Sequence, residues 1–285
     1  MKIAIIGDVH GFWNEFDVEY FNQSDYDFIL FTGDLRSYTE KESVVAERIS
    51  FLEKQAFVIP GNTDTSNSFQ AAGEIFRNQF LIQNFFLGQE SRLDKMKAAL
   101  GKLRLVGYEV HTLSKEKSID LIVLRPFAMG KELSYAPILK KRYGIRSMED
   151  SKERIKTLID SSLEENLLFL GHNGPKGLGE KETSLWSSDF TETPIDWGDE
   201  DYLFGIEYAK SRGKRVLAAI AGHMHHRLKK RNILRNWREE KEGTYFINAA
   251  RVPRIFKIDS NTVHHHIRLE INKGDVSARE MLIHP

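Results

Sequence analysis

Short, strongly apolar runs that end in glycine recur along the chain and predict buried β-strands. Because these runs are apolar throughout, they resemble strands that are covered on both faces, as in sheets flanked by helices. Strands of this kind commonly carry functional residues just beyond their carboxyl ends. The five runs are residues 3–7 (IAIIG), 28–33 (FILFTG), 56–61 (AFVIPG), 167–171 (LLFLG) and 216–222 (VLAAIAG).

Helical patterns lie between these runs, and further strand patterns accompany them. Ser147, with Asp150 three residues later, is typical of a helix start, and Gly213 is typical of a helix end. We expect helices over residues 39–54, 67–87, 91–100, 148–163 and 199–212. We expect additional strands over residues 103–107, 119–125, 244–250, 254–258, 263–271 and 278–283.

The mixture of strand and helix patterns predicts an α/β fold. Residues 126–147 have no clear period, so we expect an insertion or a lid in that segment. No repeat, low-complexity tract or linker divides the sequence. We therefore predict that residues 1–285 form one integrated domain.

Composition excludes several classes of protein. The 41 Lys and Arg residues balance the 41 Asp and Glu residues, so no long-range field draws the whole molecule to nucleic acid or to an anionic membrane. The absence of cysteine excludes disulfides and thiolate metal ligands, and it fits a reducing compartment. The N-terminal apolar run is too short for a signal peptide, and no run approaches the roughly 18–20 residues of a membrane span. We expect a cytoplasmic protein without a membrane partner.

Polar residues of the metal-binding and acid–base types follow each of the five apolar runs. Taken singly, an Asp here could cap a helix and a His could form a hydrogen bond within the core. Five such strand ends in one chain favour a functional site instead. The residues are Asp8 and His10; Asp34; Asn62, Thr63 and Asp64; His172 and Asn173; and His223, His225 and His226.

The spacing favours a metal centre over an acid–base pair. Asp8 and His10, like His223 and His225, are two residues apart, which places both side chains on one side of an extended backbone. Carboxylate, imidazole and amide groups without thiolate suit Mn²⁺, Fe²⁺, Fe³⁺ or Zn²⁺. Glycine before each ligand lets the backbone turn tightly and approach the ions.

The ordered series D-x-H, GD, GN-x-D, GH and GH-x-H, which spans residues 7–226, resembles the calcineurin-like metallophosphoesterase superfamily. The segments 173–179 (NGPKGLG), 222–228 (GHMHHRL) and 248–254 (NAARVPR) are similar to a branch of it found in cyanobacteria and plants. The resemblance implies a four-layer αββα sandwich, in which two mixed β-sheets are flanked by helices. It also implies a metal-dependent phosphoester hydrolase with a dinuclear centre at the strand ends.

The resemblance assigns the metal ligands residue by residue. One ion would be held by Asp8, His10 and His225, and the other by Asn62, His172 and His223, with Asp34 bridging the two. A hydroxide shared by the ions would attack a small phosphoester substrate in line. Asp34, Asn62 and His172 would thus be catalytic.

Thr63 departs from the family pattern. Many members have a histidine there, which acts as a general acid towards the leaving group. A threonine hydroxyl is too weak an acid for that work, and a positioned acid usually contributes about 10² to 10⁴ in rate. We expect a preference for phosphodiesters whose leaving group needs little protonation, or a substitute acid such as His226. Asp64, which the missing histidine would have paired with, is expected to hold the turn or cap a helix.

Several other residues are candidates with an ordinary alternative. Arg36, Thr63 and Arg251 could contact substrate, and for either arginine an ion pair is an equal alternative. The aromatic residues of the loop over residues 174–199 could line a pocket or pack in the core. The basic segment 227–241 could steer an anionic substrate or form a solvated hairpin. The tract His264, His265 and His266 is expected on an exposed strand.

Three alternatives to a phosphodiesterase stay open. Two are enzymes of the same fold, a phosphomonoesterase and a nuclease, and the zero net charge disfavours nucleic acid as a substrate. The third is a non-catalytic scaffold that binds a partner. The seven matching ligand side chains disfavour a scaffold, because a chain without catalysis does not need them.

Overall fold

The structure is a computed structural model of the chain. It describes residues 1–66, 78, 80–81, 86–130, 133, 136–228, 233–272 and 274–285. Most of the helix expected over residues 67–87 lies outside the described residues, as do residues 229–232 of the basic segment.

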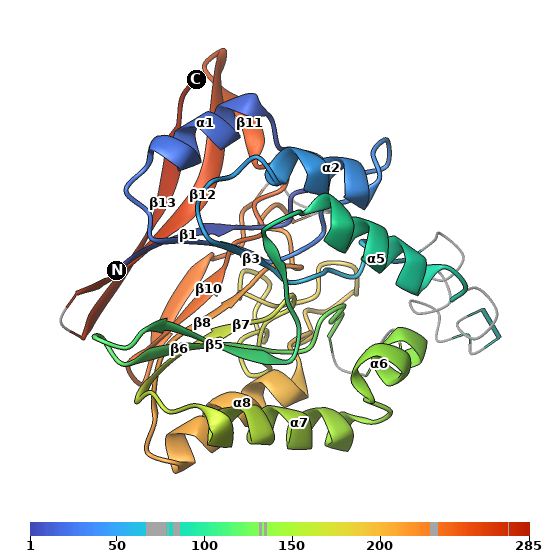
Figure 1. Ribbon diagram of the computed structural model, residues 1–285, viewed down its shortest axis with the longest axis vertical. Helices are drawn as coiled ribbons and strands as arrows, with labels where there is room; N and C mark the ends of the chain where they lie inside the picture. Colours follow the sequence, from blue (N-terminus) through green and yellow to red (C-terminus); the bar gives the residue numbers. More distant parts are fainter. Residues whose placement is uncertain are drawn as a thin grey trace.

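The first of two β-sheets has seven strands and contains both the first and the last strands of the chain (Figure 1). Strands β1 (Lys2–Ile6), β2 (Phe28–Phe31), β3 (Ala56–Val58) and β4 (Arg104–Leu105) are parallel neighbours in that order. Strand β12 (Asn261–Asn272) pairs antiparallel with β1, with β11 (Ile255–Ile258) and with β13 (Asp275–Ile283). The sheet is therefore mixed.

The second sheet has six strands in the order β5-β6-β7-β8-β10-β9. Its centre is parallel and consists of β6 (Ile119–Val123), β7 (Asn166–Leu170), β8 (Arg215–Ala221) and β10 (Thr244–Asn248). Antiparallel strands β5 (Glu109–Ser114) and β9 (Arg238–Lys241) form its edges. This sheet is mixed as well.

Alternate residues of the central strands face two different apolar layers. In β1, Ile3 and Ile5 belong to the cluster between the sheets, together with Leu168 and Leu170 of β7. Ala4 of β1 belongs to a second cluster, under helices on the outer side of the first sheet. Burial on both faces explains why these strands are apolar throughout and show no alternation with polar residues.

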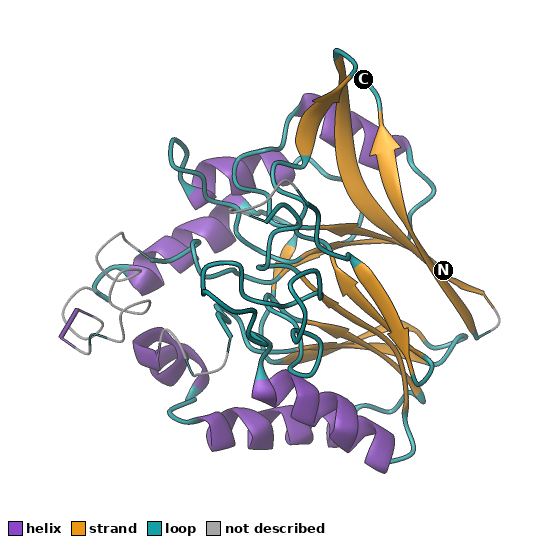
Figure 2. Ribbon diagram, turned by 180° about the vertical axis from the view of Figure 1, so that it is seen from behind, coloured by secondary structure: helices purple, strands orange, loops and turns teal. Residues whose placement is uncertain are grey.

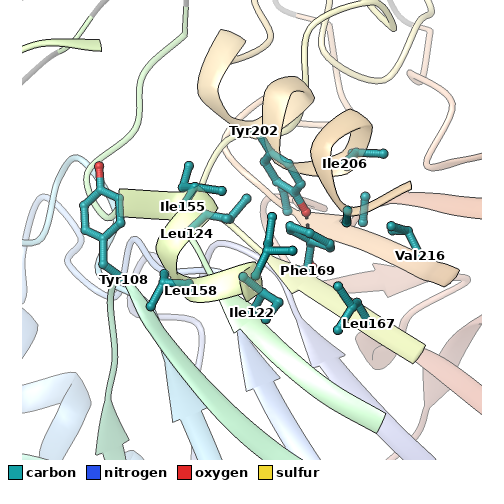
Figure 3. Packing of buried hydrophobic residues seen from close by; sticks show 14 of the residues in the cluster. Tyr108, Ile122, Leu124, Ile155, Leu158, Leu167, Phe169, Tyr202, Ile206 and Val216 are labelled. Atoms are coloured by element: carbon teal, nitrogen blue, oxygen red, sulfur yellow. Dashed lines mark hydrogen bonds between the residues drawn. The ribbon is translucent and has the colours of Figure 1, made fainter. Parts of the chain in front are cut away.

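Helices cover the outer face of each sheet (Figures 1 and 2). On the first sheet lie α1 (Glu15–Gln23), α2 (Glu42–Ile49) and α5 (Gln89–Ala99), and on the second lie α7 (Met148–Ser161) and α8 (Glu200–Ser211). Figure 3 shows Ile155 of α7 and Ile206 of α8 packed with Phe169 of β7 in the outer cluster of the second sheet. The predicted four-layer αββα sandwich is confirmed. None of the described helices is long and apolar enough to cross a membrane.

Some elements differ from those expected. Helix α1 was not expected; it begins at a capping box in which Asn14 and Asp17 each accept the backbone N–H of the other. Strands β5 and β9 were not expected either. The segment over residues 126–147 contains α6 (Ala136–Tyr143), and near its start Phe127 donates its N–H to the carbonyl of Pro60. The single domain and the insertion stay predictions.

The histidine tract of β12 is not exposed, so that expectation is wrong. The tract's three side chains are at most 1% exposed. Two of them face α1 and the loop that follows it, where the ring of His264 bonds to Asp17 and that of His266 bonds to the hydroxyl of Tyr26. His265 faces the other way and bonds to Glu280 of β13. Strand β12 lies inside its sheet and is covered on both faces, which its sequence does not reveal.

Candidate metal centre

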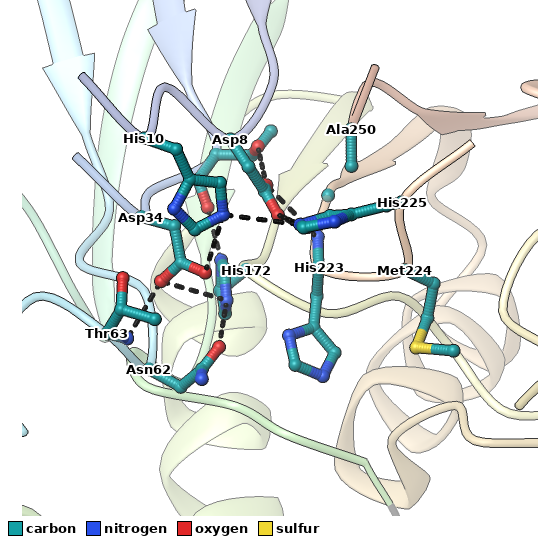
Figure 4. A network of polar contacts seen from close by, with 12 residues as sticks. Asp8, His10, Asp34, Asn62, Thr63, His172, His223, Met224, His225 and Ala250 are labelled. Atoms are coloured by element: carbon teal, nitrogen blue, oxygen red, sulfur yellow. Dashed lines mark hydrogen bonds and ion pairs between the residues drawn. The ribbon is translucent and has the colours of Figure 1, made fainter. Parts of the chain in front are cut away.

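Loops at the carboxyl ends of five strands bring the predicted metal ligands together (Figure 4). Strands β1, β2 and β3 are parallel, and so are β7 and β8, so their ends meet at one side of the sandwich. Two groups of three side chains result, and within each group the ligand atoms lie within 4.8 Å of one another. The first group is Asp8, His10 and His225, and the second is Asp34, His172 and His223.

The separations between ligand atoms fit ions placed among them. Nε2 of His10 lies 3.2 Å from Nε2 of His225, which lies 3.4 Å from Oδ2 of Asp8. A tetrahedral ion with bonds of about 2.0–2.1 Å holds its ligand atoms about 3.3 Å apart. Asp34 lies between the groups, with Oδ2 at 3.7 Å from His10 and Oδ1 at 3.6 Å from His172.

Backbone carbonyls orient two of the imidazoles. Nδ1 of His172 lies 2.6 Å from the carbonyl oxygen of Thr32, and Nδ1 of His10 lies 3.0 Å from that of Arg36. Since a carbonyl can only accept, each Nδ1 carries a proton, and in its neutral, metal-binding form each ring directs the lone pair of Nε2 into the centre. The amide oxygen of Asn62 lies 2.8 Å from Nε2 of His172. This gathering of lone pairs fits a metal cation.

Three of the ligands have a strained backbone. His10, Asp34 and His223 have φ angles of 43°, 50° and 67°, in the left-handed region that few residues other than glycine adopt. Such conformations cost of order 1–3 kcal/mol each and cluster at functional sites. The neighbouring glycine Gly61 has no alternative, because a Cβ there would lie 2.1 Å from Oδ1 of Asp34.

The charges around the centre set the protonation of its ligands. Burial opposes ionisation of Asp8, but the hydrogen bond to His225 and the charges of nearby histidines hold the pKa of its carboxyl well below the usual range. Burial, assisted by the charge of His172, lowers the pKa of His223 to about 3. Asp8 is thus a carboxylate and His223 a neutral imidazole, which are the forms that bind metals.

Asp64 holds the turn that carries Asn62. Its carboxylate accepts the N–H groups of Gly61 at 2.7 Å, Leu35 at 2.7 Å and Arg36 at 3.2 Å, so it joins the loops after β2 and β3. Burial, reinforced by the charge of Asp34, raises its pKa to about 7. Asp64 has a structural role here.

Thr63 lies beside the centre through its backbone. Its N–H donates to Oδ1 of Asp34 at 2.9 Å (Figure 4). Its hydroxyl oxygen is buried and has no hydrogen-bond partner in the described part of the chain.

The structure does not support His226 as a substitute acid. Its side chain is 2% exposed, and Nε2 donates to the carbonyl of Asn248 at 2.8 Å instead of turning to the ligand groups. Burial, with the charge of His265 beside it, lowers the pKa of His226 to about 3. A neutral imidazole is too weak an acid to protonate a leaving group at neutral pH, and the N–H of this one is engaged with a carbonyl, so this expectation is corrected.

The two candidate arginines differ in their surroundings. The guanidinium of Arg251 lies 4.3 Å from the centre of the Phe256 ring and 3.8 Å from Oε1 of Glu280, so it takes part in a structural contact. Arg36 donates from Nη1 to the carbonyl of Ser66 at 2.6 Å, and its own carbonyl orients His10. Of the two, Arg36 belongs to the wall of the centre.

Three residues that support the ligands carry no obvious signal in the sequence. Thr32 orients His172 through its carbonyl and donates its hydroxyl to Oδ1 of Asp8 at 3.2 Å. Arg235 and Asn248 are buried and bond to the turn that contains His225. Trp186 is buried and donates its Nε1 to the carbonyl of Gly222, so it packs beneath the turn and does not line a pocket.

The sequence and the fold of this chain are similar to those of known proteins. A family model described as calcineurin-like phosphoesterase matches residues 1–227. No curated protein matches the sequence. One crystal structure aligns with 98% of this chain and 98% of its own at 12% identity and a TM-score of 0.56, which shows a shared fold.

Two further solved structures align with lower scores. Phosphopantetheinyl hydrolase (PptH) from Mycobacterium tuberculosis covers 88% of this chain and 89% of its own, at 14% identity and a TM-score of 0.47. Vacuolar Protein Sorting 29 from Cryptosporidium parvum covers 100% of this chain and 98% of its own, at 11% identity and a TM-score of 0.33.

Proposed function

The chain belongs to the calcineurin-like phosphoesterase family and is a metal-dependent phosphoesterase, and from that premise we propose that it is a phosphodiesterase with a dinuclear centre. One observation carries the proposal. The two ligand groups lie side by side. Asp34 directs Oδ2 towards His10 of the first group and Oδ1 towards His172 of the second. A single ion would leave one of the two groups without a role.

The ligands divide between two ions. Asp8, His10 and His225 would hold the first ion; Asn62, His172 and His223 would hold the second, and Asp34 would bridge them. The donor set suits Mn, Fe or Zn. When bound, such ions lower the pKa of a shared water and neutralise the oxygens of a phosphoryl group under attack.

The chain's own residues prepare the site for that chemistry. Carbonyls of Thr32 and Arg36 keep Nε2 of His172 and of His10 free for the ions. The backbone N–H of Thr63 fixes one oxygen of Asp34. Arg36 is the better candidate for a phosphate contact, since Arg251 is engaged with Phe256 and Glu280.

Thr63 supports a diesterase over a monoesterase. Its hydroxyl cannot protonate a poor leaving group at neutral pH, and His226 is enclosed. A missing general acid costs about 10² to 10⁴ in rate, which is roughly 3 to 5 kcal/mol. The enzyme therefore favours phosphodiesters whose leaving group departs with little protonation.

Metal content and substrate class test the proposal directly. The protein, purified without metal and reloaded with Mn²⁺, should bind two ions per chain and hydrolyse an aryl phosphodiester faster than the matching aryl monoester. Faster turnover of the monoester would make it a phosphatase, and faster turnover of an oligonucleotide would make it a nuclease. Two bound ions without turnover of any of these substrates would favour a scaffold.

The leaving-group argument has its own test in Thr63→His. This variant should gain up to about 100-fold on alkyl diesters, which need protonation, and little on nitrophenyl diesters. Thr63→Val removes the hydroxyl without adding an acid, so it is the matched control and should keep the wild-type dependence on the leaving group. Loss of activity of Thr63→His on every substrate would show that the explanation is wrong.

A further inference from the structure

The turn over residues 222–226 carries two metal ligands and is held by side chains from elsewhere. The carbonyl of Met224, which lies between the ligands His223 and His225, accepts Nδ2 of Asn248 at 2.7 Å. The carbonyl of His225 accepts Nε of Arg235 at 3.2 Å. The backbone N–H of Arg235 also donates within this turn, to the carbonyl of residue 226 at 2.7 Å.

The turn needs such outside contacts. His223 adopts a φ of 67°, which costs free energy unless the surroundings enforce it. The side chain of His225 is 34% exposed, so packing restrains its ring less than that of His172, which is 0% exposed. The position of His225 therefore depends largely on its backbone.

Arg235 connects this backbone to a second loop. Its Nη1 donates to the carbonyl of Ser184 at 2.8 Å, while its Nε donates to His225. Three other bonds join the same loop to the turn and its flanks. They are Asn236 N–H to the Thr183 carbonyl, Asn248 Nδ2 to the Leu185 carbonyl, and Trp186 Nε1 to the Gly222 carbonyl.

Burying the charged side chain of Arg235 at this position costs free energy. Arg235 is only 3% exposed, and within the described residues its guanidinium donates to two neutral carbonyls, those of His225 and Ser184. Burial lowers its pKa to about 10, against the opposing charge of Asp189. A methionine of similar length would fill the same space without the cost of burying a charge. What the guanidinium adds is the pair of hydrogen bonds that fixes the His225 carbonyl to the loop.

We infer that Arg235 is a positioning residue that holds His225 for the first ion and has a smaller effect on the second ion, which His223 of the same turn would bind. This inference rests on the proposed function, because it requires the two ion sites. Removing a residue that forms a hydrogen bond to a metal ligand typically weakens metal binding by about 10–100-fold. Arg235 differs from most such residues in acting through the ligand's carbonyl and not through its ring.

Metal titration of the metal-free protein tests the inference without any use of activity. Co²⁺ binding is followed by absorption and by calorimetry in wild type, Arg235→Met and Arg235→Lys. His225→Ala and His172→Ala identify the signals of the first and the second ion. Arg238→Met is the matched control, because Arg238 lies in the same segment but bonds to the carbonyl of Ala278.

Arg235→Met should weaken binding of the ion that His225→Ala removes by about 10–100-fold and change its absorption spectrum, with a clearly smaller effect on the other ion. Arg235→Lys should recover part of this affinity, and Arg238→Met should match wild type. Unchanged binding of both ions in Arg235→Met, or equal weakening of both, would overturn the inference. If Arg235→Met does not fold, Arg235→Lys decides, and wild-type affinity in that variant would overturn it.

The outcome for wild type separates the two proposals. A wild-type protein that binds two ions, with normal binding in the folded Arg235 variants, refutes only the role of Arg235. A wild-type protein that binds no ion refutes the dinuclear centre, and the role of Arg235 falls with it.

Discussion

The two ligand groups each combine one aspartate with two histidines but differ in how their side chains are held in place. The first group is Asp8, His10 and His225, and the second is Asp34, His172 and His223. We call the first group the open half and the second the buried half. In the second group, the side chains of His172 and Asp34 are 0% and 4% exposed. In the first group, Asp8 is 0% exposed as well, but the side chains of His10 and His225 are 19% and 34% exposed. Packing thus restrains His10 and His225 less than His172, and they depend more on hydrogen bonds.

A rigid fold can therefore hold metal ligands that remain partly exposed to solvent. The second group is held by buried contacts, since the ring of His172 bonds to the carbonyl of Thr32, and the N–H of Gly222 donates to the carbonyl of His172 just beyond the ends of β7 and β8. The first group is packed less tightly, because the side chains of His10 and His225 are partly exposed. Bonds from Arg235 and Asn248 replace packing there.

Asp34→Asn should have the largest effect, because the carboxylate of Asp34 faces both halves. Loss of the shared carboxylate removes several kcal/mol of charge stabilisation, or about 10³-fold or more in kcat/KM. Steady-state kinetics and metal analysis measure this. Asp94→Asn, which changes an exposed carboxylate paired with Arg142, is the control and should retain activity. Full activity of Asp34→Asn would refute the assignment of the centre.

His172→Ala and His225→Ala compare the halves directly in the metal-free protein. Removal of His172 leaves the buried Thr32 carbonyl without its partner and should lower the free energy of unfolding by about 1–3 kcal/mol. Removal of the more exposed His225 should lower it by less than about 0.5 kcal/mol. Urea unfolding measures both. Equal losses would mean that the two halves do not differ in structural role.

A chelator should distinguish the halves by rate. An ion held by the partly exposed His10 and His225 should be removed faster than an ion held beside the fully buried His172. We expect two phases of metal release, and the fast phase should be absent from His225→Ala. A single phase from wild type would contradict the difference in access.

The pH dependence of the metal-free protein should show the smallest effect. Burial alone would lower the pKa of His172, but the carboxylates of Asp34 and Asp8 outweigh it and raise this pKa above the ordinary value. The resulting stabilisation is fully present below the unfolded pKa of about 6.5 and is lost as the pH rises through the folded pKa. The stability difference between wild type and His172→Ala should therefore be larger at acid than at alkaline pH, as urea unfolding at several pH values can measure. A difference that does not change with pH would contradict the raised pKa.

Much of the fold and the predicted ligands could be read from local sequence. Each of the five apolar runs is a strand, and each is followed by a glycine and a polar residue of the centre. These features are local, because a buried strand must be apolar and a tight approach to a ligand requires glycine. Helix α1 was missed because its few apolar residues give no clear helical period, although Asn14 and Asp17 mark its start.

Residues whose role depends on distant contacts could not be read in this way. The tract at residues 264–266 gives no sign that β12 is buried on both faces. His226 stands next to a ligand in sequence but is enclosed by its bond to Asn248. Arg235 belongs to a strongly basic segment, yet it is almost completely buried.

The kinds of ligand, their order along the chain and their position after strands are all visible in the amino-acid sequence. Which ligands face one another depends on how the two sheets pack. His10 and His225 are 215 residues apart, and their nitrogens lie 3.2 Å from each other because the two sheets pack with their strand ends together. Local spacing places a side chain on its own strand, but the order of strands and the packing of sheets decide which other side chain it meets.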